Sequence, residues 1–154
     1  TPLLLDLLDH VPAIDRMLVM VQLEVAERLA AAPGSRVYGL PSVKVAYWGR
    51  AEVVGRVPRT VFVPQPNVDS ALLRIERRSE PAVAGPPEVR DELFRLARLG
   101  FGQRRKMLRR SLGAAVSDAA FAAAGIDPTA RPESLGVADW GRLAAATVAA
   151  GGTS

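Results

Sequence analysis

Five consecutive apolar residues, 17–21, are followed at once by a helical pattern over residues 23–31. A run this short and this apolar is typical of a strand that is buried on both faces, as in a parallel sheet. Such a strand needs neighbouring strands and helical cover on both sides. Residues 1–79 contain no glycine-rich turn after a strand, which the first half of a doubly wound sheet would have. We therefore expect residues 1–79 to be the second half of a larger α/β sheet, and the chain to be a fragment.

The other elements of the first half follow from local patterns. Leucines that recur on one helical face predict a helix over residues 1–9. Residues 41–48 have the pattern of another helix, and residues 51–57 and 71–76 are rich in Val, Leu and Ile, as strands are. A loop marked by prolines, residues 58–69, joins these two predicted strands.

The composition changes after residue 79. Residues 80–87 contain three prolines, two alanines and a glycine, which indicates a linker. Beyond it the pattern is helical throughout, over residues 88–99, 103–112, 118–124 and 137–149. Ser117 and Gly125 are suited to begin and end the third of these helices. We predict an all-α domain over residues 88–154, after an α/β domain over residues 1–79.

Positive charge is concentrated in one short stretch. Residues 94–113 carry seven basic side chains and no acidic one, whereas the other 13 basic and 16 acidic residues of the chain sum to −3. Clustered cations of one sign repel each other on a helix, so a polyanionic partner explains them better than folding does, although a solvated helix face is the alternative. If this window is placed on a helix, Phe101, Leu108 and Leu112 fall on one stripe that would dock on the core. The residues predicted to bind RNA are Arg104, Arg105, Lys106, Arg109 and Arg110.

The composition also excludes several classes of protein. There is no cysteine and a single histidine, His10, so neither a disulfide framework nor a zinc site is expected. The apolar runs are too short to span a bilayer, and residues 1–9 lack the pattern of a secretory signal. We expect a cytoplasmic monomer without a metal or a membrane partner. His10 is expected at the surface, and Trp48 and Trp140 in the core.

The loop between the two predicted strands carries the sequence V-F-V-P-Q-P-N-V-D-S over residues 61–70. Pro64 and Pro66 restrict the backbone to extended conformations and remove two hydrogen-bond donors. Phe62 is therefore held in a fixed place, either displayed toward a ligand or buried as a core residue of a rigid loop.

Six motifs occur in order along nearly the whole chain. They are T-P at residues 1–2, V-Q-L-E-V-A-E-R-L at 21–29, Y-G-L-P-S-V at 38–43, F-X-P-X-P-X-V-D-S at 62–70, G-Q-R-R-K-M-L-R-R-S-L at 102–112 and G-I-D-P-T-A-R-P-E-S-L at 125–135. Together they resemble the ribosomal RNA adenine N6-dimethyltransferase family, in its small-subunit branch.

The resemblance implies a class I methyltransferase fold that binds S-adenosylmethionine and dimethylates N6 of two adjacent adenines near the 3′ end of small-subunit rRNA, within the small ribosomal subunit. The helical domain of the family positions the rRNA. The family's glycine-rich cofactor loop, its acidic ribose-binding residue and its Asn-Leu-Pro-Tyr motif have no counterpart here. No catalytic or cofactor-binding residue is therefore assigned, and the isolated chain is expected to be inactive.

Phe62 matches the family's aromatic residue in F-X-P-X-P, and with Pro64 it would form a wall of the pocket for the target adenine. An aromatic face replaces the stacking that a base loses when it leaves its helix. Gln22 and Glu24 are weaker candidates because they follow the predicted strand; a carboxylate such as that of Glu24 is also favourable at any helix start.

Two other functions remain open from the sequence. One is a non-enzymatic RNA-binding or ribosome-assembly module that has the RNA surface without the chemistry. The other is the related large-subunit rRNA methylase that confers macrolide resistance, which the extended match over residues 102–135 disfavours.

Overall fold

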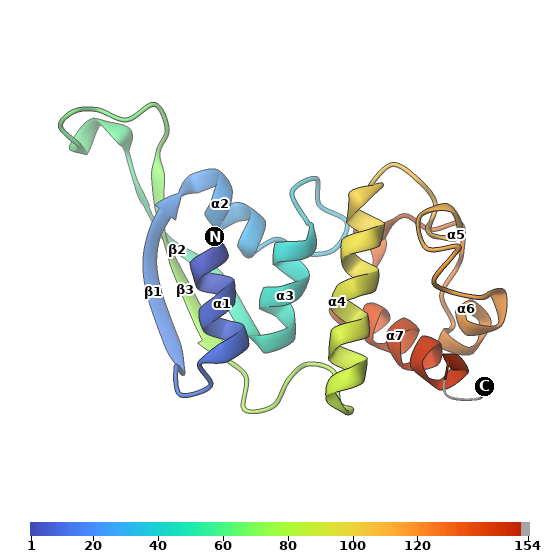
Figure 1. Cartoon of the computed structure of the whole chain (residues 1–154). Helices are drawn as coiled ribbons and strands as arrows, with labels where there is room; N and C mark the ends of the chain where they lie inside the picture. Colours follow the sequence, from blue (N-terminus) through green and yellow to red (C-terminus); the bar gives the residue numbers. More distant parts are fainter. Residues whose placement is uncertain (152–154) are drawn as a thin grey trace.

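The computed structural model describes residues 1–151. A three-stranded sheet and three helices form its first half, and a group of helices forms its second half (Figure 1). The first half contains α1 (Pro2–His10), β1 (Arg16–Gln22), α2 (Leu23–Leu29), α3 (Leu40–Trp48), β2 (Gly49–Val57) and β3 (Ser70–Arg77). The second contains α4 (Pro87–Gly102), α5 (Leu108–Ser111), α6 (Asp118–Ala124) and α7 (Val137–Gly151). No helix among residues 1–151 has the length and hydropathy needed to cross a membrane.

The sheet is antiparallel, and β3 is its central strand in the order β1-β3-β2. One face of the sheet packs against α1, α2 and α3 (Figure 1). The buried residues of this first core are aliphatic and come from both the sheet and the helices. They are Leu4, Leu8, Ala26, Leu29, Val45, Ala71, Leu73 and Ile75.

The predicted α/β class is confirmed, and within residues 1–151 the first predicted strand is an edge strand with one face uncovered. β1 lies at an edge of the sheet and pairs antiparallel with β3 along its whole length. Its side chains alternate between exposed and half-buried, and Leu18 and Met20 on the outer face are 65% and 51% exposed. The apolar run over residues 17–21 predicted a strand with both faces buried. Among residues 1–151, other elements cover only one face of β1.

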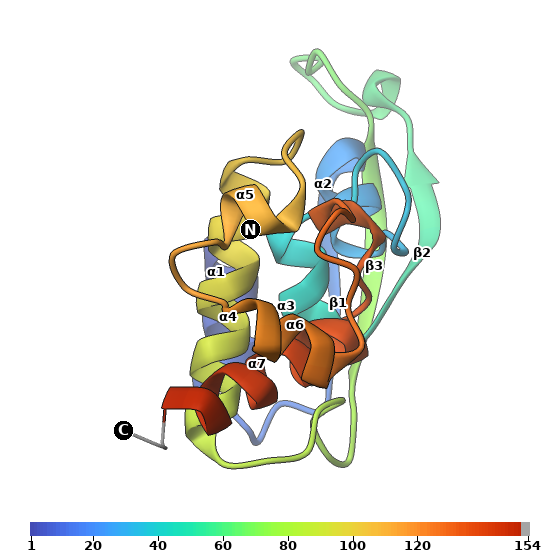
Figure 2. The ribbon, with the colours of Figure 1, turned by 90° about the vertical axis from the view of Figure 1, so that its right-hand side faces the viewer.

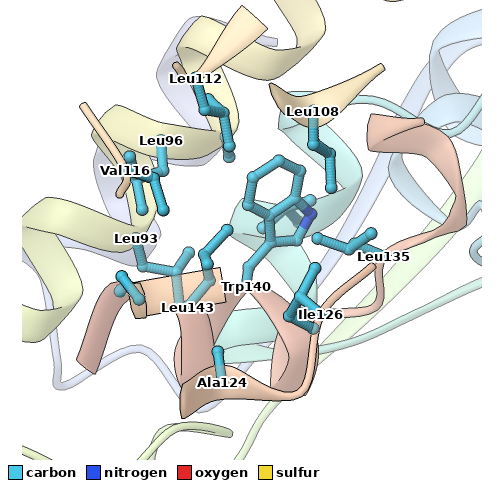
Figure 3. Packing of buried hydrophobic residues seen from close by; sticks show 14 of the residues in the cluster. Leu93, Leu96, Leu108, Leu112, Val116, Ala124, Ile126, Leu135, Trp140 and Leu143 are labelled. Carbon is cyan, nitrogen blue, oxygen red and sulfur yellow. The ribbon is translucent and has the colours of Figure 1, made fainter. Parts of the chain in front are cut away.

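The helical half has its own core around Trp140, which is fully buried between leucines of several elements (Figure 3). Gly100 allows this close approach, since a Cβ atom there would lie 2.8 Å from Cη2 of Trp140. Tyr38, Val43 and Tyr47 of the first half also belong to this core. The core therefore extends across the predicted linker, and the division into domains at residues 80–87 stays a prediction.

Local signals in the helical half predicted some elements well. α6 begins and ends where Ser117 and Gly125 indicated: the Ser117 side chain accepts a hydrogen bond from the backbone N–H of Ala120, and Gly125 has a left-handed φ of 68°. The expectations for the other aromatic and histidine side chains also hold, because Trp140 is buried, Trp48 is half-buried and His10 is exposed.

The predicted continuous helix over residues 103–112 is wrong. α4 ends at Gly102, residues 103–107 form turns, and α5 is only one turn long. The physical reason lies in two backbone N–H groups. Leu108 donates to the carbonyl of Ala130 at 2.8 Å, and Arg109 donates to that of Pro128 at 2.9 Å, so neither N–H can bond the carbonyl four residues earlier. Leu108 and Leu112 are nevertheless buried in the core, as predicted.

Candidate functional site

A hollow of about 330 Å³ lies at the carboxyl end of β1, under the loop that joins β2 to β3. Apolar side chains and prolines form most of its lining, with two polar side chains at the strand ends. The lining residues are Met20, Gln22, Phe62, Pro64, Pro66, Val68 and Ser70. The structure thus brings Phe62 and Pro64, both predicted from the loop motif, into one small concave site.

The β2–β3 loop that carries Phe62 is tied down at its base. The backbone N–H of Arg59 donates to the Asp69 carboxylate at 2.9 Å, and the backbone N–H of Leu23 donates to the Asp69 carbonyl at 3.0 Å. Phe62 is half-buried and belongs to neither hydrophobic core, so its interpretation as a core residue is wrong. The loop holds an aromatic face at the edge of an open hollow, which suits a planar ligand.

Of the two weaker candidates after β1, only one lines this hollow. Gln22 is the last residue of β1 and contributes to the lining, opposite Ser70 of β3. Glu24 lies in the first turn of α2, outside the hollow, and its carboxylate contacts the Arg28 guanidinium at 3.0 Å. Glu24 therefore has the helix role that its position indicated.

A second hollow, of about 640 Å³, gathers positive charge in the helical half. Its lining residues are Gln103, Arg105, Lys106, Met107, Arg110 and Arg131. We call Arg105, Lys106, Arg110 and Arg131 the basic hollow. Among residues 1–151, none of these four cations has an acidic partner within ion-pair distance. Unpaired, converging cations in a concavity are suited to bind phosphate groups.

The cations that line this hollow differ from the set predicted to bind RNA in two ways. Arg109, which was predicted, does not line the basic hollow, whereas Arg131, which was not predicted, does. Arg131 is an isolated basic residue in the sequence, next to Pro132, and only the fold brings it beside the 103–110 segment. The turn conformation of residues 103–107, rather than a helix face, presents Arg105 and Lys106.

Arg104 is engaged inside the protein and is not one of the free cations. Its guanidinium donates hydrogen bonds to the backbone carbonyls of Tyr38 and Arg36, each at 2.6 Å, and to that of Ser35 at 3.3 Å. It also forms an ion pair with Glu133 at 3.2 Å. Arg104 therefore joins the α2–α3 loop to the helical half, and its predicted role in RNA binding stays a prediction.

Two further contacts hold the same junction. The Glu133 carbonyl accepts from the Gly34 backbone N–H at 2.7 Å, and the Tyr38 hydroxyl donates to the Leu135 carbonyl at 2.7 Å. Burial raises the pKa of Tyr38 well above its ordinary value, so this hydroxyl stays protonated and keeps donating in alkaline solution, where an exposed tyrosine would ionise. The junction fixes the helical half, and with it the basic hollow, against the sheet.

We predict that Arg104→Gln lowers the free energy of unfolding by about 1–3 kcal/mol, because it leaves backbone carbonyls without their donor. Arg105→Gln is the matched control and should leave stability nearly unchanged. For RNA binding the roles of the two variants are reversed. Arg105→Gln should make the salt dependence of RNA affinity shallower, whereas Arg104→Gln should leave it unchanged. Denaturant unfolding and a salt series of RNA binding measure both. A stable Arg104 variant with a shallower salt dependence would show that Arg104 contacts RNA.

The described residues do not fit S-adenosylmethionine. β1 runs directly into α2 at Gln22 and Leu23, without the glycine-rich turn that lets a cofactor approach a helix N-terminus. Within residues 1–151, no group of three His, Asp or Glu side chains is placed to hold a metal ion either.

The two hollows lie in different halves of the molecule. In Figure 1 the β2–β3 loop extends beyond the sheet at the upper left and α5 lies at the right, with α2, α3 and α4 between them, and the view turned by 90° (Figure 2) shows both segments in the upper part of the molecule.

Comparisons with known proteins agree on one family. The model of the family described as "Ribosomal RNA adenine dimethylase" matches residues 1–147. The "Ribosomal RNA small subunit methyltransferase A" of Cutibacterium acnes is 48% identical over 160 residues, which cover 99% of this chain and 54% of that protein. The protein of the same name from Streptomyces avermitilis is 49% identical over 148 residues, which cover 93% and 50%. The chain spans about half the length of the curated relatives it matches.

Two solved structures share the fold. A dimethyladenosine transferase from Plasmodium falciparum superposes with a TM-score of 0.72 at 22% identity, over 92% of this chain and 60% of that one. The 23S rRNA methyltransferase ErmE superposes with a TM-score of 0.65 at 26% identity, over 94% of this chain and 59% of that one.

Proposed function

The chain belongs to the ribosomal RNA adenine dimethylase family, and from that premise we propose that it is part of an enzyme that dimethylates N6 of two adjacent adenines near the 3′ end of small-subunit rRNA. The methyl donor would be S-adenosylmethionine, bound by the part of the relatives' length that this chain does not span. This chain would form part of the pocket for the target base and would bind the rRNA backbone. On its own it would be inactive.

The observation that carries the proposal is the hollow beside Phe62, at the carboxyl end of β1. Ligands of open α/β sheets bind at the carboxyl ends of strands, and an enzyme that modifies a base must take that base out of its stack. Phe62 would stack on the extruded adenine, while Pro64 keeps the wall rigid. The basic hollow of the helical half would hold the phosphates of the flanking rRNA, which positions the strand without reading its sequence.

The edge position of β1 supports a continuation of the sheet. Its free edge presents backbone groups without a neighbouring strand among residues 1–151, and its outer face exposes Leu18 and Met20. An exposed apolar strand edge is a liability in an isolated protein. A further strand from the remaining half of the parent protein would pair with the free edge of β1, and covering helices would bury its exposed apolar side chains.

Two observations distinguish the alternatives from the proposed function: whether a methyl group is transferred, and which ribosomal subunit is the substrate. A non-enzymatic RNA-binding module would bind small subunits without methylating them. A large-subunit methylase would act on large subunits, as the 23S rRNA methyltransferase does. The relatives at 48% identity bear names that refer to the small subunit, and this favours the small-subunit substrate.

We predict that the isolated 154-residue chain neither binds S-adenosylmethionine in isothermal titration nor transfers labelled methyl groups, because its strands lack a cofactor loop. The full-length parent should bind the cofactor and should label unmethylated small subunits but not large ones. Micromolar cofactor affinity of the isolated chain would contradict the first part. Binding to small subunits by a parent that transfers no methyl group would favour the non-enzymatic module.

A further inference from the structure

We propose that the side-chain amide of Gln22 recognises the target adenine by its Hoogsteen edge, accepting from N6–H and donating to N7. The inference rests on the proposed function, because it assigns a specificity-determining residue to the same hollow. In this site Phe62 and Pro64 would provide only stacking and rigidity. Gln22 would add a polar side chain that distinguishes adenine from other bases.

The backbone around Gln22 is fixed. Gln22 is the last residue of β1 and lies opposite Ser70 in the register of the β1–β3 pair. The next residue, Leu23, begins α2 and donates its N–H to the carbonyl of Asp69 at 3.0 Å. Strand pairing on one side and this hydrogen bond on the other set the direction in which the Gln22 side chain leaves the backbone.

The amide of Gln22 is available for a ligand. It is an exposed side chain, and within residues 1–151 its amide atoms make no hydrogen bond. Its neighbours in the hollow are apolar apart from Ser70, so the amide is the longest polar group there. A concave apolar site with one or two placed polar groups is the usual form of a small-ligand pocket, in which the polar groups give orientation and specificity.

A carboxamide is complementary to adenine in a way that it is not to other bases. Its oxygen can accept from N6–H while its NH₂ group donates to N7, as glutamine does when it reads adenine in the major groove. Guanine presents acceptors at both O6 and N7, so the amide oxygen would face O6 without a hydrogen between them. With Phe62 stacked on the ring, the amide would lie in the plane of the base and select adenine.

The experiment pairs a change in the protein with a change in one atom of the base. Unmethylated small subunits are reconstituted with a 3′-terminal rRNA segment in which both target adenosines are 7-deazaadenosine, which lacks the N7 acceptor. The wild-type full-length parent should methylate these subunits roughly 10- to 100-fold more slowly than natural ones. Gln22→Leu should be slower by a similar factor on natural subunits and should show little further loss with 7-deazaadenosine.

Gln22→Glu, which keeps the shape of the side chain but has no N–H to give to N7, should also become insensitive to the 7-deaza change. Arg16→Gln, on the same face at the other end of β1, should keep the full sensitivity of the wild type. Cofactor affinity by titration should be unchanged in all variants. If the wild type methylates natural subunits and the Gln22 variants stay as sensitive to 7-deazaadenosine as it is, the role of Gln22 is refuted and the function stands. A wild type that methylates neither substrate would refute both.

Discussion

Replacing Phe62 with alanine in the full-length parent should lower the rate of adenine methylation about 10- to 100-fold, because stacking of a base on an aromatic side chain contributes roughly 1–3 kcal/mol. Phe62 is half-buried and lies outside both hydrophobic cores, so the change leaves the packed interior intact and removes only the aromatic face that we propose stacks on the adenine. Methylation rates on small subunits, with cofactor and subunit affinities measured separately, give the test.

Two matched variants identify the cause of the loss. Phe62→Tyr keeps the aromatic face and should retain most of the activity, whereas Phe62→Leu keeps apolar bulk without that face and should resemble alanine. Subunit affinity should hardly change, because the basic hollow supplies most of the binding. Full activity of a folded Phe62→Ala protein would show that no base stacks on this side chain.

Replacing Arg105, Lys106 and Arg110 together with glutamine should weaken binding to small subunits roughly a hundredfold at 0.1 M salt, because each lost phosphate contact removes about 0.7–0.9 from the slope of log affinity against log salt. The three cations have no acidic partner within ion-pair distance among residues 1–151, and their removal relieves repulsion. Thermal unfolding should therefore change little.

The control for this triple variant removes cations from another surface. Arg16→Gln and Arg50→Gln alter the exposed face of the sheet and should leave affinity and slope nearly unchanged. Arg131→Gln should reproduce part of the triple effect, since the fold places Arg131 in the basic hollow. An unaltered slope in a folded triple variant would mean that these side chains form a solvated surface and that rRNA binds elsewhere.

Sequence patterns predicted the elements whose stability is local. Ser117 and Gly125 act within one helix, so the bounds of α6 follow from residue type alone. The partner of a strand is not local: residues 17–21 indicate a strand, but only the pairing with β3 shows that it is antiparallel in this chain. The helix predicted over residues 103–112 is reduced to one turn because carbonyls some twenty residues away, in Pro128 and Ala130, bind two of the N–H groups that it needs.

The same difference between local and long-range effects decides which features of the candidate site could be predicted from the sequence. Pro64 and Pro66 closely follow Phe62 in the sequence, so a fixed position for Phe62 was predictable from them, whereas its display toward a ligand was implied only by the resemblance to the family. Arg104 and Arg105 are neighbours of identical type, and no sequence pattern could show that one is bound to three carbonyls while the other lines the basic hollow. Gln22 and Phe62 line the same hollow only because β3 pairs with β1 and so brings the end of β1 beside the β2–β3 loop.

The product of the reaction is the most direct test of the proposed function. Small subunits that lack methylation are incubated with the full-length parent and S-adenosylmethionine, and the 3′-terminal rRNA fragment is analysed by mass spectrometry. We predict two adjacent N6,N6-dimethyladenines in this fragment, and none in large-subunit rRNA treated in the same way. Unmodified small-subunit rRNA, or modification of the large subunit alone, would contradict the account.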